Sequence, residues 1–279
     1  MPKPCDLLPE NLPALPPRPP AGHKGSFGHV YVLGGSPEMG GALSLAALAA
    51  YRAGAGLVTG IGHPDAQIHL AALVPEATWM DWPPRLINRV PEPAILALGP
   101  GLGQGLAAHD LVREAATLSQ RQVWDADALN ILARFGPGIL SATTERIFTP
   151  HPGEAARLLH WSTAQVQADR SAAIAQLVQS YSGIWILKGE GTLLSDGSFL
   201  GRCPWGNPGM ATGGSGDVLT GLIAGLWAQG LPALAAASLG VCIHARAGDL
   251  AAAELGQASL LARDLIAQIP QVLQQWRTH

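Results

Sequence analysis

The sequence predicts an α/β fold in which helices cover both faces of one mostly parallel sheet. Short apolar runs alternate with Ala- and Leu-rich segments from about residue 23 onward. Strands that are apolar throughout are typical of parallel sheets buried on both faces. Nearly every glycine-rich or polar segment directly follows one of these runs. Because ligands bind beyond the carboxyl ends of strands in such sheets, we expect these segments to converge on one crevice.

The chain begins with a proline-rich segment, residues 1–22, which is expected to form an extended arm. Residues 23–279 contain no linker and are expected to form a single domain. Its first strand is the apolar run 29–33, which stops at a pair of glycines. A helix follows over 42–53, where alanine and leucine dominate until Gly54, and the next apolar run, 57–61, is the second strand.

The later elements follow the same logic. Four more apolar runs end in glycine, lysine, proline or an acidic residue and are predicted as strands: 94–98, 122–125, 146–149 and 183–187. Residues 192–195 and 198–200 flank Asp196-Gly197, which is a hairpin signal. Apolar helical patterns then start at Asp217 and after Pro232, and a last one covers 260–276.

Composition excludes several classes of function. Charged residues make up 13% of the chain and the formal net charge is −3, which argues against a nucleic-acid surface. The cysteines form no CxxC pair, so neither a disulfide framework nor a structural zinc site is expected. No run of about 18 uninterrupted apolar residues marks a membrane span. We therefore expect a cytoplasmic protein that binds neither nucleic acid nor membrane.

Several familiar enzyme motifs fail on their spacing. The chain has no Gly-Lys dipeptide, which excludes a P-loop, and the glycines of 99–103 do not complete a GxGxxG pattern. His151 and Glu154 lack the HExxH spacing, and Ser215 does not stand in a GxSxG elbow. A serine hydrolase, a zinc protease and a dinucleotide-dependent hydride-transfer enzyme are therefore disfavoured.

The segment 207–217 carries the strongest functional signal. It is rich in glycine and precedes an apolar helix pattern, so its backbone N–H groups and the positive end of the helix dipole can cradle a phosphate. The carboxylate of Asp217 would repel a bound phosphate and so would not assist binding. Its presence at this position therefore indicates a catalytic role, that of a general base. The alternative is an ordinary glycine-rich turn in which Asp217 only complements the helix dipole.

Two further segments after strands are candidates for the same site. In 188–192 a lysine lies among glycines, which is typical of a nucleotide phosphate contact, although a turn with a solvated lysine fits equally. In 151–154 an imidazole and a carboxylate meet at a strand–helix junction, where Thr149 or Gly153 is expected to cap the helix. Glu154 either complements the helix dipole or holds water on a phosphate-bound Mg²⁺.

The acidic segment 125–130 follows another strand. Asp125 is nearer the end of that strand than Asp127 and is therefore the more site-like of the two. One of the pair is expected to cap the following helix.

These segments occur together in one order, and at this point the set resembles a known family. The motifs are KGSFGH at 24–29, LGGS at 33–36, GPGLG at 99–103, DADALN at 125–130, TPHPGE at 149–154, LKG at 187–189 and the loop 207–217. The chain is similar, over roughly residues 23–270, to the ADP-dependent NAD(P)H-hydrate dehydratases of the ribokinase-like superfamily. The resemblance implies a ribokinase-like three-layer sandwich with 23–279 as its catalytic domain. Glu190-Gly191 within the lysine loop and His63 are minor departures from the family pattern.

The resemblance also implies an activity: dehydration of the S epimer of hydrated NADH or NADPH back to NAD(P)H, with ADP converted to AMP and phosphate. ADP is then a co-substrate and Mg²⁺ a cofactor, with Glu154 acting on the ion only through water. The residues implied for ADP or AMP are Lys188, Gly189, Glu190, Gly191, Thr192, Gly213, Gly214, Ser215 and Gly216. The residues implied for the hydrated cofactor are Ala42, Gly101, Gly103, His151 and Asp217.

Under this hypothesis Asp217 takes the proton of the ring hydroxyl as that oxygen attacks ADP. Some family members carry an N-terminal epimerase domain, so we expect a separate epimerase in the same pathway. A homo-oligomer is a family expectation, a tetramer being one option. The residues leave open the choice between NADH and NADPH hydrates and between ADP and ATP. They also leave open a small-molecule kinase of the same superfamily, acting on a hydroxymethylpyrimidine, a thiazole alcohol or a sugar, and a non-catalytic nucleotide sensor.

Overall fold

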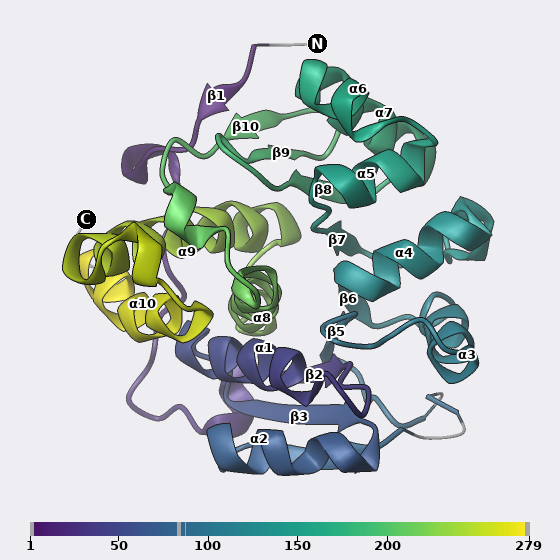
Figure 1. Ribbon diagram of the computed structural model, residues 1–279. Coiled ribbons are helices and arrows are strands. Elements are labelled where there is room, and N and C mark those ends of the chain that lie inside the picture. Colours follow the sequence, from purple (N-terminus) through teal and green to yellow (C-terminus); the bar gives the residue numbers. More distant parts are fainter. Residues whose placement is uncertain (1–2, 83–84, 87, 277–279) are drawn as a thin grey trace.

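The computed structural model describes residues 3–82, 85–86 and 88–276 (Figure 1). Residues 1–2 of the predicted arm and 277–279 of the predicted domain therefore lie outside the described residues. One ten-stranded sheet runs through the described chain in the order β1-β10-β9-β8-β7-β6-β5-β2-β3-β4. The strands are β1 Cys5–Asp6, β2 His29–Leu33, β3 Leu57–Gly62, β4 Thr78–Asp81, β5 Ile95–Leu98, β6 Arg121–Trp124, β7 Arg146–Phe148, β8 Ile184–Leu187, β9 Leu193–Ser195 and β10 Leu200–Arg202.

Most of the sheet is parallel, as predicted. All neighbouring pairs from β4 to β8 are parallel, and β9 is antiparallel to both β8 and β10. The carboxyl ends of β5 to β8 therefore lie side by side at one edge of the sheet. The loops after these strands carry most of the predicted site residues.

Helices cover both faces of the sheet, which confirms the predicted three layers. On one face lie α1 (Gly40–Ala53), α2 (Gln67–Leu73), α8 (Ser215–Ala228), α9 (Ala233–Leu255) and α10 (Ala262–Trp276). On the other lie α3 (Leu106–Ala115), α4 (Ala126–Phe135), α5 (Pro152–Leu159), α6 (Thr163–Ala168) and α7 (Arg170–Tyr181), as Figure 1 shows. Among the described residues, no helix is both long and apolar enough to cross a membrane.

Alternate side chains of each central strand enter the two cores. In β2, Val30 and Val32 pack under α1 and α8, whereas Tyr31 and Leu33 face the opposite layer. Both sets are buried, which explains why these residues of β2 do not alternate between apolar and charged types. The hydrophobic effect therefore holds helices on both faces of the sheet.

A close helix pair fixes the position of the glycine-rich loop. A Cβ atom on Gly221 of α8 would collide with the carbonyl oxygen of Ala46 in α1, so only glycine lets the two backbones meet at this crossing. This contact anchors α8 against the buried α1. The N-terminus of α8, where the phosphate cradle is predicted, is consequently held beside the strand ends.

Most predicted elements are found within two residues of their expected bounds, and one strand is displaced. The second hairpin strand was expected at 198–200, but β10 starts at Leu200. Asp196 is the cause, because its Oδ1 accepts hydrogen bonds from the N–H groups of Ser198 (2.9 Å) and Phe199 (2.8 Å). The turn therefore extends through residue 199.

The proline-rich segment 3–22 contributes to the edge of the sheet. Its residues Cys5–Asp6 form β1, which pairs in parallel with β10. Asp6 receives two hydrogen bonds from the Arg202 guanidinium, at 2.7 and 3.0 Å. The neighbouring Leu7 is buried in the core.

Candidate active site

A buried ion pair joins two strand ends at the centre of the crevice. Lys188 follows β8, and its Nζ lies 2.7 Å from Oδ1 of Asp125, which follows β6. The other carboxylate oxygen of Asp125 accepts a hydrogen bond from the Thr220 hydroxyl of α8 at 2.9 Å. Burial opposes both charges, but each offsets the penalty on the other, so the pKa of Asp125 is lowered and that of Lys188 is raised. Both groups are therefore charged at neutral pH.

Asp125 occupies the N-cap position of α4, but its side chain does not cap that helix. One of Asp125 and Asp127 was expected to do so, and neither forms a cap bond. Asp125 binds Lys188 and Thr220 instead, while Asp127 accepts a hydrogen bond from the N–H of Gly103 at 2.9 Å. Both carboxylates are thus bonded to other site residues, and the N-terminus of α4 has no side-chain acceptor as its cap.

Hydrogen bonds from an arginine side chain fix the backbone of the lysine loop 188–192. Arg170, the first residue of α7, donates hydrogen bonds to the carbonyl oxygens of Leu187 and Glu190, both at 2.9 Å. The Thr192 hydroxyl closes the loop by donating to the carbonyl oxygen of Gly189, also at 2.9 Å. The carbonyl oxygens of Leu187 and Glu190 therefore face Arg170, whereas the side chain of Lys188 lines the crevice.

The glycine-rich loop ends at the N-terminus of α8, as predicted. Gly214 has a left-handed backbone (φ 89°), and the helix begins at Ser215, two residues before the expected start at Asp217. A Cβ atom on Gly216 would lie 3.1 Å from Nζ of Lys188. The free N–H groups at this helix end, its dipole and the lysine ammonium therefore all face one small region, which suits an anion.

Asp217 stands in the first turn of α8, half-buried. Burial and the nearby charge of Asp125 raise the pKa of its carboxyl to about 7. Within the described part of the chain, its carboxylate accepts no hydrogen bond from another residue, in contrast to Asp125 and Asp127. The group can therefore accept a proton near neutral pH and is not committed to a structural partner.

His151 and Glu154 form a reciprocal cap at the start of α5. The Nδ1 atom of His151 accepts from the N–H of Gly153 at 2.9 Å, and Glu154 accepts from the N–H of His151 at 2.7 Å. The predicted cap, Thr149 or Gly153, was wrong: the Thr149 hydroxyl donates to the carbonyl oxygen of Trp124. Burial lowers the pKa of His151 and raises that of Glu154 to about 7.

Three of the predicted contacts of the hydrated cofactor, Ala42, Gly101 and Gly103, lie near the start of α1. Gly101 (φ 59°) lies against α1, and a Cβ atom built on it would come within 3.0 Å of the Ala42 Cβ. Gly103 faces Ser36 and is fixed by its bond to Asp127. Small residues here leave room for a flat ring beside the start of α1.

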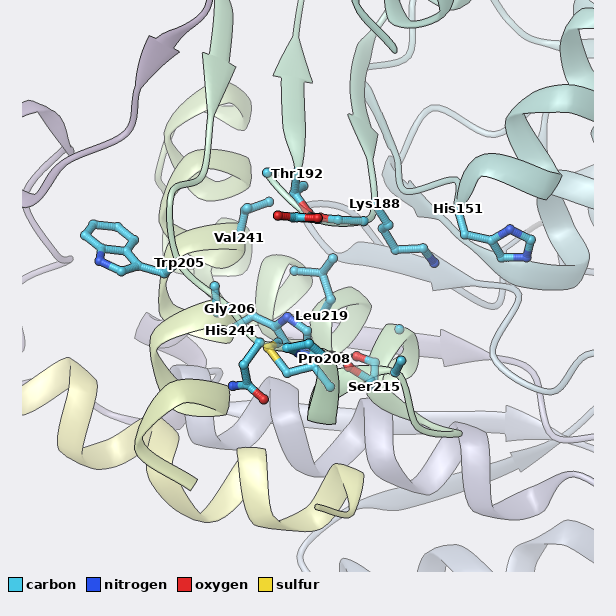
Figure 2. A pocket seen from close by; sticks show the side chains of 18 of the residues that line it. His151, Lys188, Thr192, Trp205, Gly206, Pro208, Ser215, Leu219, Val241 and His244 are labelled. Carbon is cyan, nitrogen blue, oxygen red and sulfur yellow. Dashed lines mark hydrogen bonds between the residues drawn. The ribbon is translucent and has the colours of Figure 1, made fainter. Parts of the chain in front are cut away.

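A cavity of about 840 Å³ adjoins the ion pair (Figure 2). The predicted ADP residues Lys188 to Thr192, Ser215 and Gly216 line it, together with His151. Gly213 and Gly214 lie in the loop beside it without lining it. Asp217, Ala42, Gly101 and Gly103 do not line it either. The structure therefore separates a nucleotide-sized cavity from a second group of site residues, with Lys188 and the N-terminus of α8 between them.

Several cavity residues were not predicted from the sequence. They are mostly apolar: Trp205, Pro208, Met210, Leu219, Val241 and Ala245. Figure 2 places Trp205 on one side of the cavity and Lys188 and His151 on the other. His244 of α9 also lines it, and its Nε2 lies 2.9 Å from the carbonyl oxygen of Ser215. Burial lowers the pKa of His244 to about 4, so its ring is neutral at pH 7. The cavity thus has an apolar end suited to a base and a cationic end suited to phosphates.

The carboxylates near Lys188 fit Mg²⁺ only indirectly. Both oxygens of Asp125 are occupied by Lys188 and Thr220, and Oε2 of Glu154 accepts the His151 N–H. Mg²⁺ prefers several oxygen ligands and readily keeps water. The donor set therefore suits an ion held mainly by nucleotide phosphates, with Glu154 reaching it through water.

Comparison with known proteins shows the family of this chain. The sequence model of a family described as NAD(P)H-hydrate dehydratase matches residues 30–271. The bifunctional NAD(P)H-hydrate repair enzyme Nnr of Vibrio cholerae is 46% identical over 93% of this chain and 52% of its own length. The ADP-dependent (S)-NAD(P)H-hydrate dehydratase of Neisseria meningitidis is 40% identical over 87% of this chain and 84% of its own. The chain spans about half the length of the bifunctional relatives it matches.

A solved structure shares the whole fold. The ADP/ATP-dependent NAD(P)H-hydrate dehydratase of Bacillus subtilis, co-crystallised with ATP and Mg²⁺, superposes with a TM-score of 0.87. It is 28% identical, and the match covers 97% of this chain and 98% of that one. A ribokinase-like protein of Enterococcus faecalis matches with a TM-score of 0.86 and 28% identity. By sequence and by ribokinase-like fold, the chain belongs to the NAD(P)H-hydrate dehydratase family.

Proposed function

We propose that this protein repairs hydrated nicotinamide cofactor by ADP-dependent dehydration. The substrate is the S epimer of NADH or NADPH hydrated at the C5–C6 bond, and the products are NAD(P)H, AMP and phosphate. The names of the relatives support this reaction class. The observation that carries the proposal for this chain is the position of Asp217, a carboxyl with a pKa raised to about 7 by burial, one residue beyond the glycine that faces Lys188.

ADP occupies the 840 Å³ cavity in this proposal. Its base lies at the apolar end near Trp205 and its phosphates at the end formed by Lys188 and the N-terminus of α8. The loop residues Gly189, Glu190, Gly191 and Thr192 contact the nucleotide, and Gly213, Gly214, Ser215 and Gly216 offer backbone N–H groups to the phosphates. Lys188 supplies positive charge where the β-phosphoryl group is transferred.

The hydrated ring lies between Asp217 and the group formed by Ala42, Gly101 and Gly103. Asp217 removes the proton of the C6 hydroxyl as that oxygen attacks the β-phosphorus of ADP, and the bond from phosphorus to the bridging oxygen breaks to release AMP. Hydroxide, a poor leaving group, has then become a phosphate ester. The hydrogen bond from the Gly153 N–H fixes the orientation of the His151 ring, and this ring also contacts the substrate.

Dehydration then needs no further reagent. The lone pair of the ring nitrogen expels phosphate from C6, and loss of the C5 proton restores the ring double bond. Mg²⁺ bound by the phosphates supplies charge neutralisation during the transfer. Atoms balance as hydrate plus ADP giving NAD(P)H, AMP, phosphate and one proton.

The direct test supplies (S)-NADH hydrate with ADP, with ATP or with neither, and follows the near-ultraviolet absorbance of reduced nicotinamide. The proposal expects absorbance to return only with a nucleotide, together with stoichiometric phosphate. Accumulation of a stable phosphorylated alcohol when pyrimidine, thiazole or sugar alcohols are supplied, without recovery of NADH, would instead identify a kinase.

We also infer a cytoplasmic homo-oligomer that works beside a separate epimerase. Described residues Cys5, Cys203 and Cys242 are free thiols, which supports a reducing compartment. The family resemblance supports the homo-oligomer. The word bifunctional in the names of longer relatives supports a second activity in the same repair. Size-exclusion chromatography with light scattering measures the subunit number.

A further inference from the structure

A second cavity of about 640 Å³ opens beside the predicted cofactor site. It lies over α4 and between the start of α5 and the start of α6. Two guanidinium groups and an imidazole line it, from Arg134, Arg157 and His160, and none of the described lining residues is acidic. A cavity of this size with concentrated positive charge suits an anionic portion of a small molecule.

Two of the loops that line this cavity also carry residues of the predicted cofactor site. Gln104 lines it and directly follows Gly103, and the Gln104 amide donates to the same Asp127 carboxylate that holds the Gly103 N–H. Gly153 lines it from the other wall and is bonded to the His151 ring. Gly103 and His151 are both predicted to contact the hydrated cofactor. A residue that lines this cavity therefore follows each of them within two positions of the chain.

The two arginines are held by neighbours and not paired with carboxylates in the described structure. Arg157 donates to the side-chain oxygen of Asn130 at 2.9 Å, and Arg134 lies 3.4 Å from Nε2 of His109. Neither partner atom belongs to a carboxylate, so both guanidinium charges stay available to an anion. The charge of Arg157 also reaches the active site: after burial and Lys188, it contributes to the lowered pKa of His151.

We propose that this cavity binds the adenosine ribose of the hydrated dinucleotide and recognises its 2′-phosphate, so that the hydrate of NADPH is preferred over that of NADH. The inference rests on the proposed function. ADP fills the 840 Å³ cavity, so the remainder of the dinucleotide leaves the ring site toward the second cavity, along the segments that follow Gly103 and His151. The half-buried Trp161 offers a flat apolar face for the adenine. A 2′-phosphate adds up to about two negative charges in the cavity that Arg134 and Arg157 both line.

The test replaces both arginines in Arg134→Gln/Arg157→Gln and compares KM for the two hydrates at saturating ADP. Because charged hydrogen bonds are lost only with NADPH hydrate, its KM should rise about 10-fold or more, while the KM for NADH hydrate should rise about threefold or less. Wild-type KM should be lower for NADPH hydrate. Arg263→Gln, an exposed change on α10 away from both cavities, controls for net charge.

A second measurement separates this inference from the proposed function. NADP⁺ and NAD⁺ are titrated calorimetrically into the wild type and the double variant, which requires no turnover. Selective weakening of NADP⁺ binding supports the cavity assignment even if neither hydrate is a substrate. Equal effects on both dinucleotides, or no effect on either, would overturn it, as would a wild type that does not distinguish NADP⁺ from NAD⁺.

Discussion

The Nζ atom of Lys188 lies 2.7 Å from Oδ1 of Asp125, and this single contact ties the end of β8 to the end of β6. Thr220 of α8 bonds the second oxygen of the same carboxylate, so three separate elements meet at one buried group. The lysine that is proposed to meet the nucleotide phosphates is thereby held in place before any ligand binds. Preorganised charge of this kind is more effective in catalysis than charge that must be reoriented.

Asp125→Asn should reduce the free energy of unfolding by about 3–5 kcal/mol, because it removes the nearer counter-charge of the buried Lys188 ammonium and leaves Oε2 of Glu154, 3.9 Å from Nζ, as its partner. Urea denaturation measures this loss. Asp110→Asn, an exposed change on α3, is the control and should shift stability by no more than about 0.5 kcal/mol. Equal stability of the two variants would show that the ion pair does not hold the strand ends together.

Gly216→Ala should weaken ADP binding while leaving the fold intact. The added Cβ would lie 3.1 Å from Nζ of Lys188 and 3.5 Å from Oδ2 of Asp125, so the ammonium must move from the phosphate position. We expect KM for ADP to rise about 10-fold, which corresponds to about 1.4 kcal/mol. In Gly138→Ala the new Cβ meets nothing within 4 Å, so kinetics should not change. A normal KM in Gly216→Ala would argue against phosphate binding beside this glycine.

Turnover should depend on pH through Asp217. Burial and then Asp125 raise the pKa of its carboxyl to about 7, and only the ionised form can accept a proton. The value of kcat/KM should therefore rise about tenfold per pH unit below about pH 7 and level off above it. The rate profile between about pH 5 and about pH 8 tests this. A profile that stays flat across that range would exclude a base with this pKa.

Asp217→Asn should lower the turnover of the enzyme while raising its free energy of unfolding. Turnover should fall by about two orders of magnitude or more, with little change in ADP affinity. Stability should rise by about 1–2 kcal/mol at about pH 8, after allowance for solvent screening, because the ionised carboxyl is disfavoured where it is buried. At low pH the Asp217 carboxyl is protonated in both the folded and the unfolded protein and does not affect the free energy of unfolding. The stability gained by Asp217→Asn should therefore shrink as pH falls toward 3.8, the ordinary pKa of an aspartate. Turnover near the wild-type level in a stably folded variant would refute the role of Asp217.

The positions of most strands along the chain and of the site loops were predictable because local sequence determines them. Residues 30–33 of the run 29–33 are aliphatic or aromatic and buried, and the run forms β2 with the expected bounds. The lysine loop and the glycine-rich loop also follow their strands as expected. Contiguous motifs at strand ends are visible in sequence because their chemistry depends on neighbouring residues.

Contacts between distant segments were not predictable in the same way. Trp205, Leu219 and Val241 line the nucleotide cavity, but on a helix or loop such residues are indistinguishable from core until the rotation of that element is known. Thr220 lies in an apolar helix pattern, and only its bond to Asp125 gives it a place in the site. His151 caps α5 through a ring nitrogen, a role that residue preferences assign to Ser, Thr, Asp or Asn.

The central claim is that the substrate hydroxyl attacks ADP after Asp217 removes its proton. The decisive measurement uses (S)-NADH hydrate whose C6 hydroxyl carries isotopically heavy oxygen, followed by mass spectrometry of the released phosphate. Attack on the β-phosphorus places the heavy oxygen in the phosphate, which is the result expected here. Heavy oxygen found in water, with unlabelled phosphate, would mean that ADP is hydrolysed separately and would contradict this mechanism.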